Sequence, residues 1–140
     1  MNTRVKLVCL VSLGVIFLST NVFVSASEEK EKKVPEPKLI PLDLGAKEYM
    51  QILGGPPETV TMHSGLVVLD PGKSVGKHNT KNYEEVLVIL EGGGEMMITD
   101  GPTLQLKAGS IAYCPPRMEH DVICTGSVKL KYVYVVANAE

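Results

Sequence analysis

Three side chains in the second half of the chain have the residue types and spacing of a metal site. His78 and Glu85 flank a turn near Lys81-Asn82, and His120 follows the turn signal Pro115-Pro116. Strands are expected on both sides of each turn, so folding them back brings the two imidazoles and the carboxylate together. This set of ligands binds a single divalent transition metal.

The segments that must position these side chains have the pattern of an all-β protein. Gly- and Pro-rich turn signals recur from residue 39 onward, with short apolar runs between them. Short strands at this spacing are typical of a sandwich or barrel. Only residues 44–53 are interpreted as a possible short helix. The expected strands are 65–69, 86–90, 95–99, 110–114, 121–124 and 130–137.

The same residues resemble the two sequence motifs of the cupin superfamily. Seven positions match at the motif spacings and in order: Gly72, His78, Glu85, Gly92, Gly109, Pro115 and His120. The chain departs from the motifs at three positions: Thr80 replaces the second His, Arg117 a Gly, and Cys124 an Asn. The resemblance covers roughly residues 65–137.

The resemblance implies a double-stranded β-helix barrel, also called a jelly roll, with a metal at its centre. The carried-over ligands are His78, Glu85 and His120, and the ion is Fe, Mn, Zn, Ni or Cu. A hydroxyl is a poor ligand beside imidazole and carboxylate, so Thr80 is expected to hydrogen-bond a metal-bound water or Glu85. The alternative is a metal-free barrel with hydrogen-bonded histidines. A buried, unpaired carboxylate would be costly, which favours the metal.

Three further side chains are candidates for ligand contact. His63 precedes an expected strand and could line the mouth of the barrel, although an ordinary strand or loop histidine is the alternative. Tyr113 and Arg117 lie near the turn before His120. Arg117 could meet an anionic ligand there or merely solvent. Glu84 should point to the opposite face from Glu85 and is excluded.

The two cysteines after the N-terminal segment are expected to stay unpaired. If the segment between Pro115 and Met118 joins two paired strands, Cys114 lies opposite His120. Cys124 is then about four residues further along, roughly 13 Å away at ~3.3 Å per residue. Disulfide Cα pairs lie within ~7 Å.

The N-terminus has the pattern of an export signal. Arg4 and Lys6 precede a largely apolar run that ends with small residues at Ala26. We expect residues 1–26 to be a cleaved signal peptide, with an uncleaved anchor as the alternative. Residues 27–38 are charged and Pro-containing, which predicts a flexible linker. Residues 39–140 are expected to form a single domain, located in the periplasm or outside the cell.

Composition limits the partners. The formal net charge of the 140-residue chain is -2, with 14 basic and 16 acidic side chains, so nothing suggests a nucleic-acid surface. No membrane association is expected after signal cleavage.

Val86 and Val88 alternate with apolar residues, so their strand is apolar on both faces, and the strand at 130–137 has the same pattern. The second face needs a cover, which predicts a homodimer.

These observations support three hypotheses for function. The first is an exported metal-binding cupin that holds a small anionic or oxygen-rich ligand. The second is a metal-dependent enzyme of the dioxygenase or isomerase type. The third is a metal-free structural or interaction module. An acid-base group within reach of the metal would separate the enzyme from the binding protein.

Overall fold

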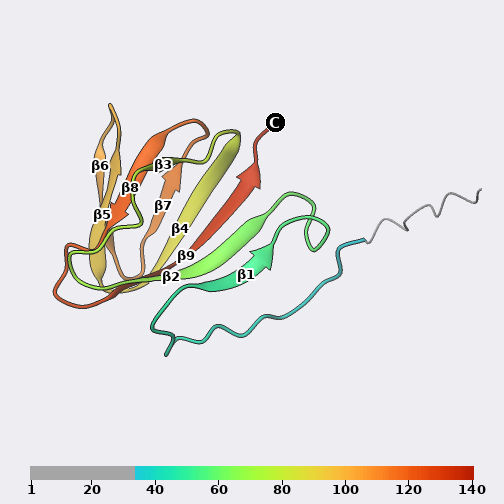
Figure 1. Cartoon of the computed structure of the whole chain (residues 1–140), viewed down its shortest axis with the longest axis horizontal. Coiled ribbons are helices and arrows are strands. Elements are labelled where there is room, and N and C mark those ends of the chain that lie inside the picture. The colour runs from blue at the N-terminus through green and yellow to red at the C-terminus, as the bar shows by residue number, and fades with distance from the viewer. Residues whose placement is uncertain (1–33) are drawn as a thin grey trace, which may run out of the picture. The chain divides into compact units, whose positions relative to one another are not determined.

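A computed structural model describes residues 34–140 and shows a two-sheet β structure (Figure 1). The predicted signal peptide and most of the predicted linker lie outside the described residues. All the strand pairs are antiparallel, and no residue of 34–140 is helical. The nine strands are β1 (Met50–Gly54), β2 (His63–Leu69), β3 (His78–Asn79), β4 (Tyr83–Glu91), β5 (Gly93–Ile98), β6 (Thr103–Lys107), β7 (Ile111–Cys114), β8 (Glu119–Ile123) and β9 (Leu130–Asn138).

The strands form one sheet of five and one of four. The five-stranded sheet has the order β1-β2-β9-β4-β7, and the four-stranded sheet has the order β3-β8-β5-β6. Consecutive strands often change sheet, as β3 and β4 do, so the chain winds between the layers. Residues from both sheets build the core, including Leu87 and Ile89 from β4 and Met96 from β5.

The predicted alternation along β4 is confirmed. Glu85, Leu87 and Ile89 are buried, whereas Val86 and Val88 are only partly buried. On the neighbouring strand β9, Tyr132 lies opposite Ile89. One face of β4 therefore points into the core and carries Glu85 with it.

A glycine makes the crossing from β4 to β5 possible. Gly92 has a φ of +74°, and a Cβ atom there would lie 2.2 Å from the carbonyl oxygen of Lys129. Both observations exclude an ordinary side chain. The chain can therefore leave the five-stranded sheet at Glu91 and enter the four-stranded sheet at Gly93.

Two expectations about local structure are wrong. Residues 44–53 form no helix, because Met50–Gly54 pairs with β2 as an additional edge strand. In addition, β7 and β8 do not pair with each other. Cys114 lies opposite Glu85 on β4, and His120 lies opposite His78 on β3. The segment between Pro115 and Met118 therefore connects the two sheets rather than closing a hairpin.

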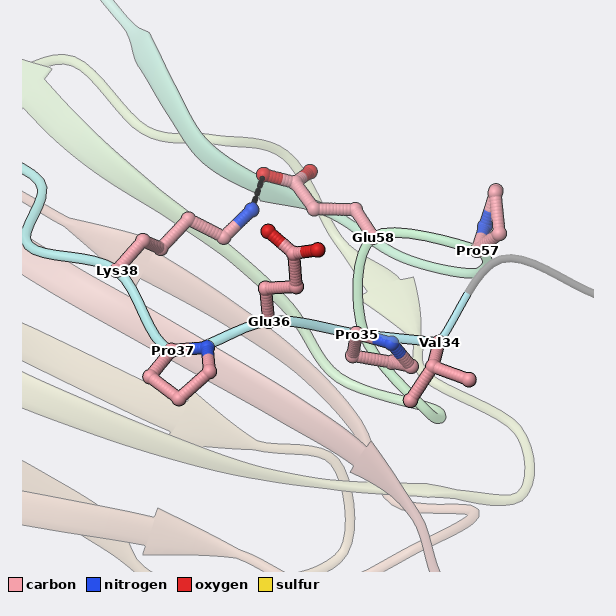
Figure 2. Close-up of a pocket in the computed structure, with 7 residues that line it drawn as sticks. All are labelled: Val34, Pro35, Glu36, Pro37, Lys38, Pro57 and Glu58. Atoms are coloured by element: carbon pink, nitrogen blue, oxygen red, sulfur yellow. Dashed lines mark hydrogen bonds and ion pairs between the residues drawn. The ribbon is translucent and has the colours of Figure 1, made fainter.

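The described part of the predicted linker has no secondary structure. Residues 34–38 run beside the loop that contains Pro57 and Glu58, and together they line a cavity of about 460 Å³ (Figure 2). Lys38 Nζ lies 2.6 Å from Glu58 Oε1. No helix among the described residues is long and apolar enough to cross a membrane.

Candidate metal centre

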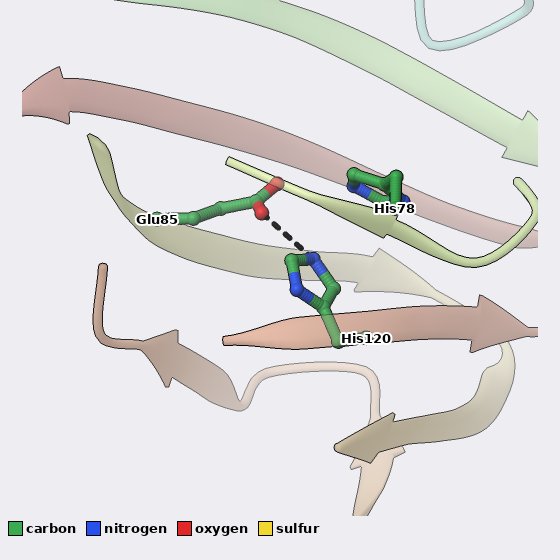
Figure 3. A group of neighbouring side chains, drawn as sticks. All are labelled: His78, Glu85 and His120. Carbon is green, nitrogen blue, oxygen red and sulfur yellow. Dashed lines mark ion pairs between the residues drawn. The ribbon is translucent and has the colours of Figure 1, made fainter. Parts of the chain in front are cut away.

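His78, Glu85 and His120 come together between the two sheets (Figure 3). Each offers one ligand atom, and the three atoms lie within 4.8 Å of one another. The register explains this meeting: His78 and His120 are cross-strand partners in β3 and β8, and Glu85 enters from β4 in the other sheet. The convergence expected from the spacing is therefore present.

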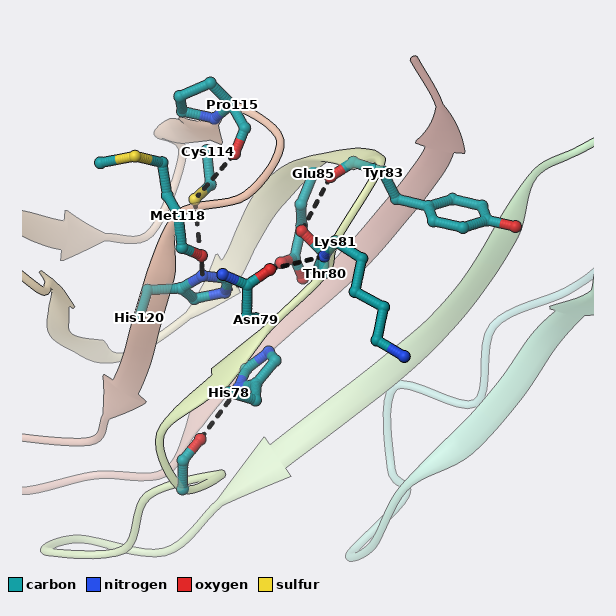
Figure 4. A network of polar contacts seen from close by, with 11 residues as sticks. His78, Asn79, Thr80, Lys81, Tyr83, Glu85, Cys114, Pro115, Met118 and His120 are labelled. Carbon is teal, nitrogen blue, oxygen red and sulfur yellow. Dashed lines mark hydrogen bonds and ion pairs between the residues drawn. The ribbon is translucent and has the colours of Figure 1, made fainter. Parts of the chain in front are cut away.

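His120 is fully buried, and its surroundings fix the imidazole tautomer. Nδ1 lies 3.2 Å from the carbonyl oxygen of Met118 and 3.4 Å from the sulfur of Cys114 (Figure 4). A carbonyl oxygen can only accept, so Nδ1 is assigned as the donor. In the neutral ring, Nε2 is then left with a lone pair on the side of Glu85.

His78 has the same arrangement. Its Nδ1 lies 2.8 Å from the carbonyl oxygen of Gly76, which again makes this nitrogen the donor. The ring centroids of His78 and His120 are 4.4 Å apart. Metal-binding histidines generally donate their second N–H to a carbonyl or carboxylate in this way, which fixes the ring and leaves the other nitrogen for the ion.

The carboxylate of Glu85 gives the clearest test of whether a cation fits. Glu85 is 7% exposed, and its Oε2 atom lies 3.0 Å from His120 Nε2. Their contact lacks the alignment of a hydrogen bond, and both atoms are buried without any hydrogen-bond partner in the described structure. A buried polar atom without a hydrogen-bond partner costs about 1–3 kcal/mol when it is neutral and more when it is charged. A metal ion bound by both side chains would remove this cost.

Opposing effects act on the pKa of His120. Burial lowers it, whereas the Glu85 carboxylate, the Met118 carbonyl and the Asp121 charge raise it, and the net result is a pKa above the ordinary value of 6.5. In the metal-free protein, a proton on His120 therefore supplies the positive charge that pairs with Glu85.

The hydroxyl of Thr80 does not contact Glu85. It donates to the carbonyl oxygen of Tyr83 at 2.7 Å (Figure 4). Thr80 nevertheless lines the same cavity as His78 and Glu85. Of the two roles expected from the sequence, the direct bond to Glu85 is therefore absent in this structure.

Two of the three ligand side chains, His78 and Glu85, border a cavity of about 270 Å³. Its wall consists of Val67, Val75, His78, Thr80, Glu85, Val122, Tyr132, Tyr134 and Val136. A second cavity of about 360 Å³ shares Thr80, Tyr134 and Val136 with the first. Any small molecule bound next to the ligand atoms must contact this wall.

The three other candidates from the sequence lie in different places. His63 lines the second cavity, where its ring meets that of Tyr83 edge to face at 6.0 Å. Tyr113 is 51% exposed and donates to Glu84 at 3.1 Å on the opposite face from Glu85. Arg117 is exposed and forms an ion pair with Glu140. Tyr113 and Arg117 therefore lie outside the group of three ligand side chains, and so does Glu84.

Sequence reasoning assigned no role in the site to three residues that contribute to it. Tyr132 and Tyr134 line the cavity, and Cys114 lies against the ring of His120. The alternation along β9 could have identified the tyrosines as core-facing. The sequence places Cys114 opposite His120 across a hairpin, whereas in the structure Cys114 reaches His120 from the other sheet, through the pairing of β7 with β4. Cys114 and Cys124 are both buried and form no disulfide bond.

Comparison with known proteins supplies the context for this geometry. The protein family described as "Cupin domain" matches residues 65–136, a range that contains all three ligand side chains. No curated protein sequence matches the chain significantly.

Several solved structures share the arrangement of the strands. An RmlC-like cupin family protein with a double-stranded β-helix fold, from Methanocaldococcus jannaschii, superposes with a TM-score of 0.61 at 22% identity, covering 74% of this chain and 92% of that one. A predicted oxalate decarboxylase from Thermotoga maritima gives 0.51 at 20% identity, with coverage of 67% and 95%.

A cupin domain from Schizosaccharomyces pombe gives a TM-score of 0.58 at 17% identity. That match covers 64% of this chain but only 63% of the other, so the chain spans less than two thirds of that protein. At these identities the likeness establishes the fold. The all-β, double-stranded β-helix architecture expected from the sequence is confirmed.

Proposed function

This chain belongs to the cupin family, and from that premise we propose that it binds one divalent transition metal and a small oxygen-donor ligand. His78, Glu85 and His120 would hold the ion. Two imidazoles and one carboxylate suit Fe, Mn, Zn, Ni or Cu, and they leave positions open for a ligand. A metal in such a site supplies Lewis-acid polarisation of a bound oxygen.

One observation carries this proposal. Glu85 Oε2 and His120 Nε2 are buried 3.0 Å apart, and neither has a hydrogen-bond partner in the described structure. The Nδ1 atoms of both histidines are meanwhile occupied by backbone carbonyls. The chain therefore directs the Nε2 atom of His120 and a carboxylate oxygen of Glu85 at one point, with the Nδ1 atom of each histidine held by the backbone, as in metal-binding histidines generally.

The placement of the other polar groups favours a binding role over turnover. Tyr113 and Arg117 lie outside the cavity and cannot serve as an acid or base there. His63 borders the adjoining cavity, so it is the histidine to examine if the metal-dependent enzyme alternative is pursued. Thr80, whose proton is donated to Tyr83, can orient a polar group in the cavity only as an acceptor.

Metal content of the purified full chain tests the proposal. We expect about one transition-metal ion per chain in the wild type and the loss of most of it in Glu85→Gln and His120→Ala. Two matched controls are available: Glu84→Gln changes the adjacent carboxylate on the opposite face, and His63→Ala removes an imidazole outside the ligand group. Both controls should keep the metal.

The test is decided by the contrast between site and control variants. Stoichiometric metal that survives in both Glu85→Gln and His120→Ala would overturn the assignment. Circular dichroism on each variant identifies any change that merely unfolds the barrel.

We also propose that the protein is exported, as the pattern of residues 1–26 indicates. The support is the sequence pattern alone. Expression with the natural N-terminus in a bacterial host should yield a periplasmic or secreted chain that begins at Ser27, as read by mass spectrometry. A full-length chain retained in the membrane fraction would favour the uncleaved anchor.

A further inference from the structure

The wall of the metal-side cavity is mainly apolar, apart from the ligand side chains themselves. Four valines from different parts of the fold meet there: Val67 of β2, Val75 of the loop before β3, Val122 of β8 and Val136 of β9. The rings of Tyr132 and Tyr134 complete the wall. Binding to such a wall is favoured by the burial of apolar groups of the ligand, and not by contacts with polar groups.

Two hydroxyl groups of the wall already have hydrogen-bond partners within the chain. The Tyr134 hydroxyl lies 3.1 Å from the Tyr49 hydroxyl, and the Thr80 hydroxyl donates to Tyr83. No lysine or arginine is among the described residues that line either of the two neighbouring cavities. A ligand with a second anionic group, away from the metal, would therefore leave that charge without a partner.

The shape of the space adds a size limit. About 270 Å³ lies beside the ligand atoms, which is slightly below the ~300–1,000 Å³ of pockets for drug-sized ligands. The adjoining cavity shares Thr80, Tyr134 and Val136, so a ligand body can extend over Val136 toward His63. One ring or a short branched chain fits this volume.

We propose that the ligand of this protein has one oxygen-donor head group and an apolar body of about the size of an aromatic ring. The inference rests on the proposed function, because the head group needs the metal. It goes further by excluding small ligands that are polar throughout. The apolar wall is the source of specificity, and the metal is the source of anchoring.

Two hydroxamates with the same chelating head group test this inference. Acetohydroxamate carries a methyl group, whereas benzohydroxamate carries a phenyl ring. Their affinities for the full chain loaded with Zn²⁺ are measured by isothermal titration calorimetry. We expect benzohydroxamate to bind about tenfold more tightly or better, because its ring is buried against the valines.

The outcomes separate the two proposals. Equal affinities would overturn the apolar-body inference while leaving the metal site intact. If neither compound binds the loaded chain, but both bind Zn²⁺ in solution, the proposed function fails instead.

Variants of adjacent valines locate the effect. Val136→Thr places a hydroxyl in the cavity wall at nearly the same volume, whereas Val135→Thr makes the same change on the opposite face of β9. We expect the affinity ratio of the two hydroxamates to fall severalfold in Val136→Thr and to stay unchanged in Val135→Thr. Val122→Thr is a second wall variant in case the first is poorly folded. A ratio unaffected by both wall variants would overturn the inference.

Discussion

At the scale of single residues, the site is organised by what lies behind the histidines. The backbone carbonyls of Gly76 and Met118 accept hydrogen bonds from the Nδ1 atoms of His78 and His120, respectively. The side chains therefore need no further polar partner to hold the neutral tautomer. The buried carboxylate of Glu85, by contrast, obtains a polar partner only when an ion or a proton is bound beside it.

Thr80 occupies the position where the cupin motif has a second histidine, and its role can be tested by two substitutions. Thr80→Val removes the hydroxyl, and we expect metal affinity to fall by no more than the ~10–100-fold typical of partners outside the ligand set. Thr80→His adds an imidazole beside Glu85 and should raise the affinity. Both are measured by competition with a chromophoric chelator. Complete loss of metal in Thr80→Val would show that the hydroxyl is a direct ligand.

The raised pKa of His120 predicts how the metal-free protein responds to pH. A folded-state pKa above the unfolded value of 6.5 stabilises the protein below pH 6.5, and this contribution is lost as the pH rises through the folded pKa. In the presence of a chelator, urea unfolding should therefore show a smaller free energy of unfolding at pH 8 than at pH 6.

The control for this prediction is Glu85→Gln, which removes the carboxylate that raises the pKa of His120. The difference between wild type and this variant should shrink from pH 6 to pH 8. A difference that grows with pH would contradict the assignment of the pair. Metal-loaded protein should show the reverse trend, because acid protonates the imidazoles and releases the ion.

At the scale of elements, the barrel depends on turns that carry the chain between sheets. Gly92→Ala should destabilise the protein more than Gly109→Ala, although both glycines have positive φ. The left-handed backbone costs alanine about 1 kcal/mol at either position. At Gly92 the new Cβ also meets the Lys129 carbonyl at 2.2 Å, whereas nothing lies within 4 Å at Gly109. Urea unfolding of both variants compares the two costs, and equal losses would contradict the steric argument.

The turn signals and apolar alternation in the sequence predict the positions of the strands better than they predict which strands pair. The strands around His78, Glu85 and His120 follow from turn signals and alternation, and the motif resemblance brings the three side chains together. The edge strand β1 is missed because its pairing with β2 depends on a partner that local pattern does not show. The expected hairpin that pairs Cys114 with His120 is wrong for the same reason, since β7 joins the sheet of β4 rather than that of β8.

At the scale of the whole molecule, the outward face of the five-stranded sheet is unevenly covered. Leu66 on this face is fully buried, and the Leu44 carbonyl accepts a hydrogen bond from Lys131 of β9. The segment before β1 therefore reaches this face. At the β7 edge, by contrast, Ile111 is 71% exposed and Tyr113 51%. Apolar area of this kind, next to half-buried valines of β4, is typical of an interaction surface.

We therefore predict that the protein is a homodimer through the β4 and β7 end of this sheet. Light scattering at micromolar concentration should give about twice the chain mass. Ile111→Lys places a charge on the proposed interface and should shift the protein to the monomer, whereas Met97→Lys makes the same change on the four-stranded sheet, at a residue that is 37% exposed, and should leave the dimer intact. A wild-type monomer that stays soluble would show that the segment before β1 covers enough of the sheet by itself, because the remaining exposed area would then be too small to drive association.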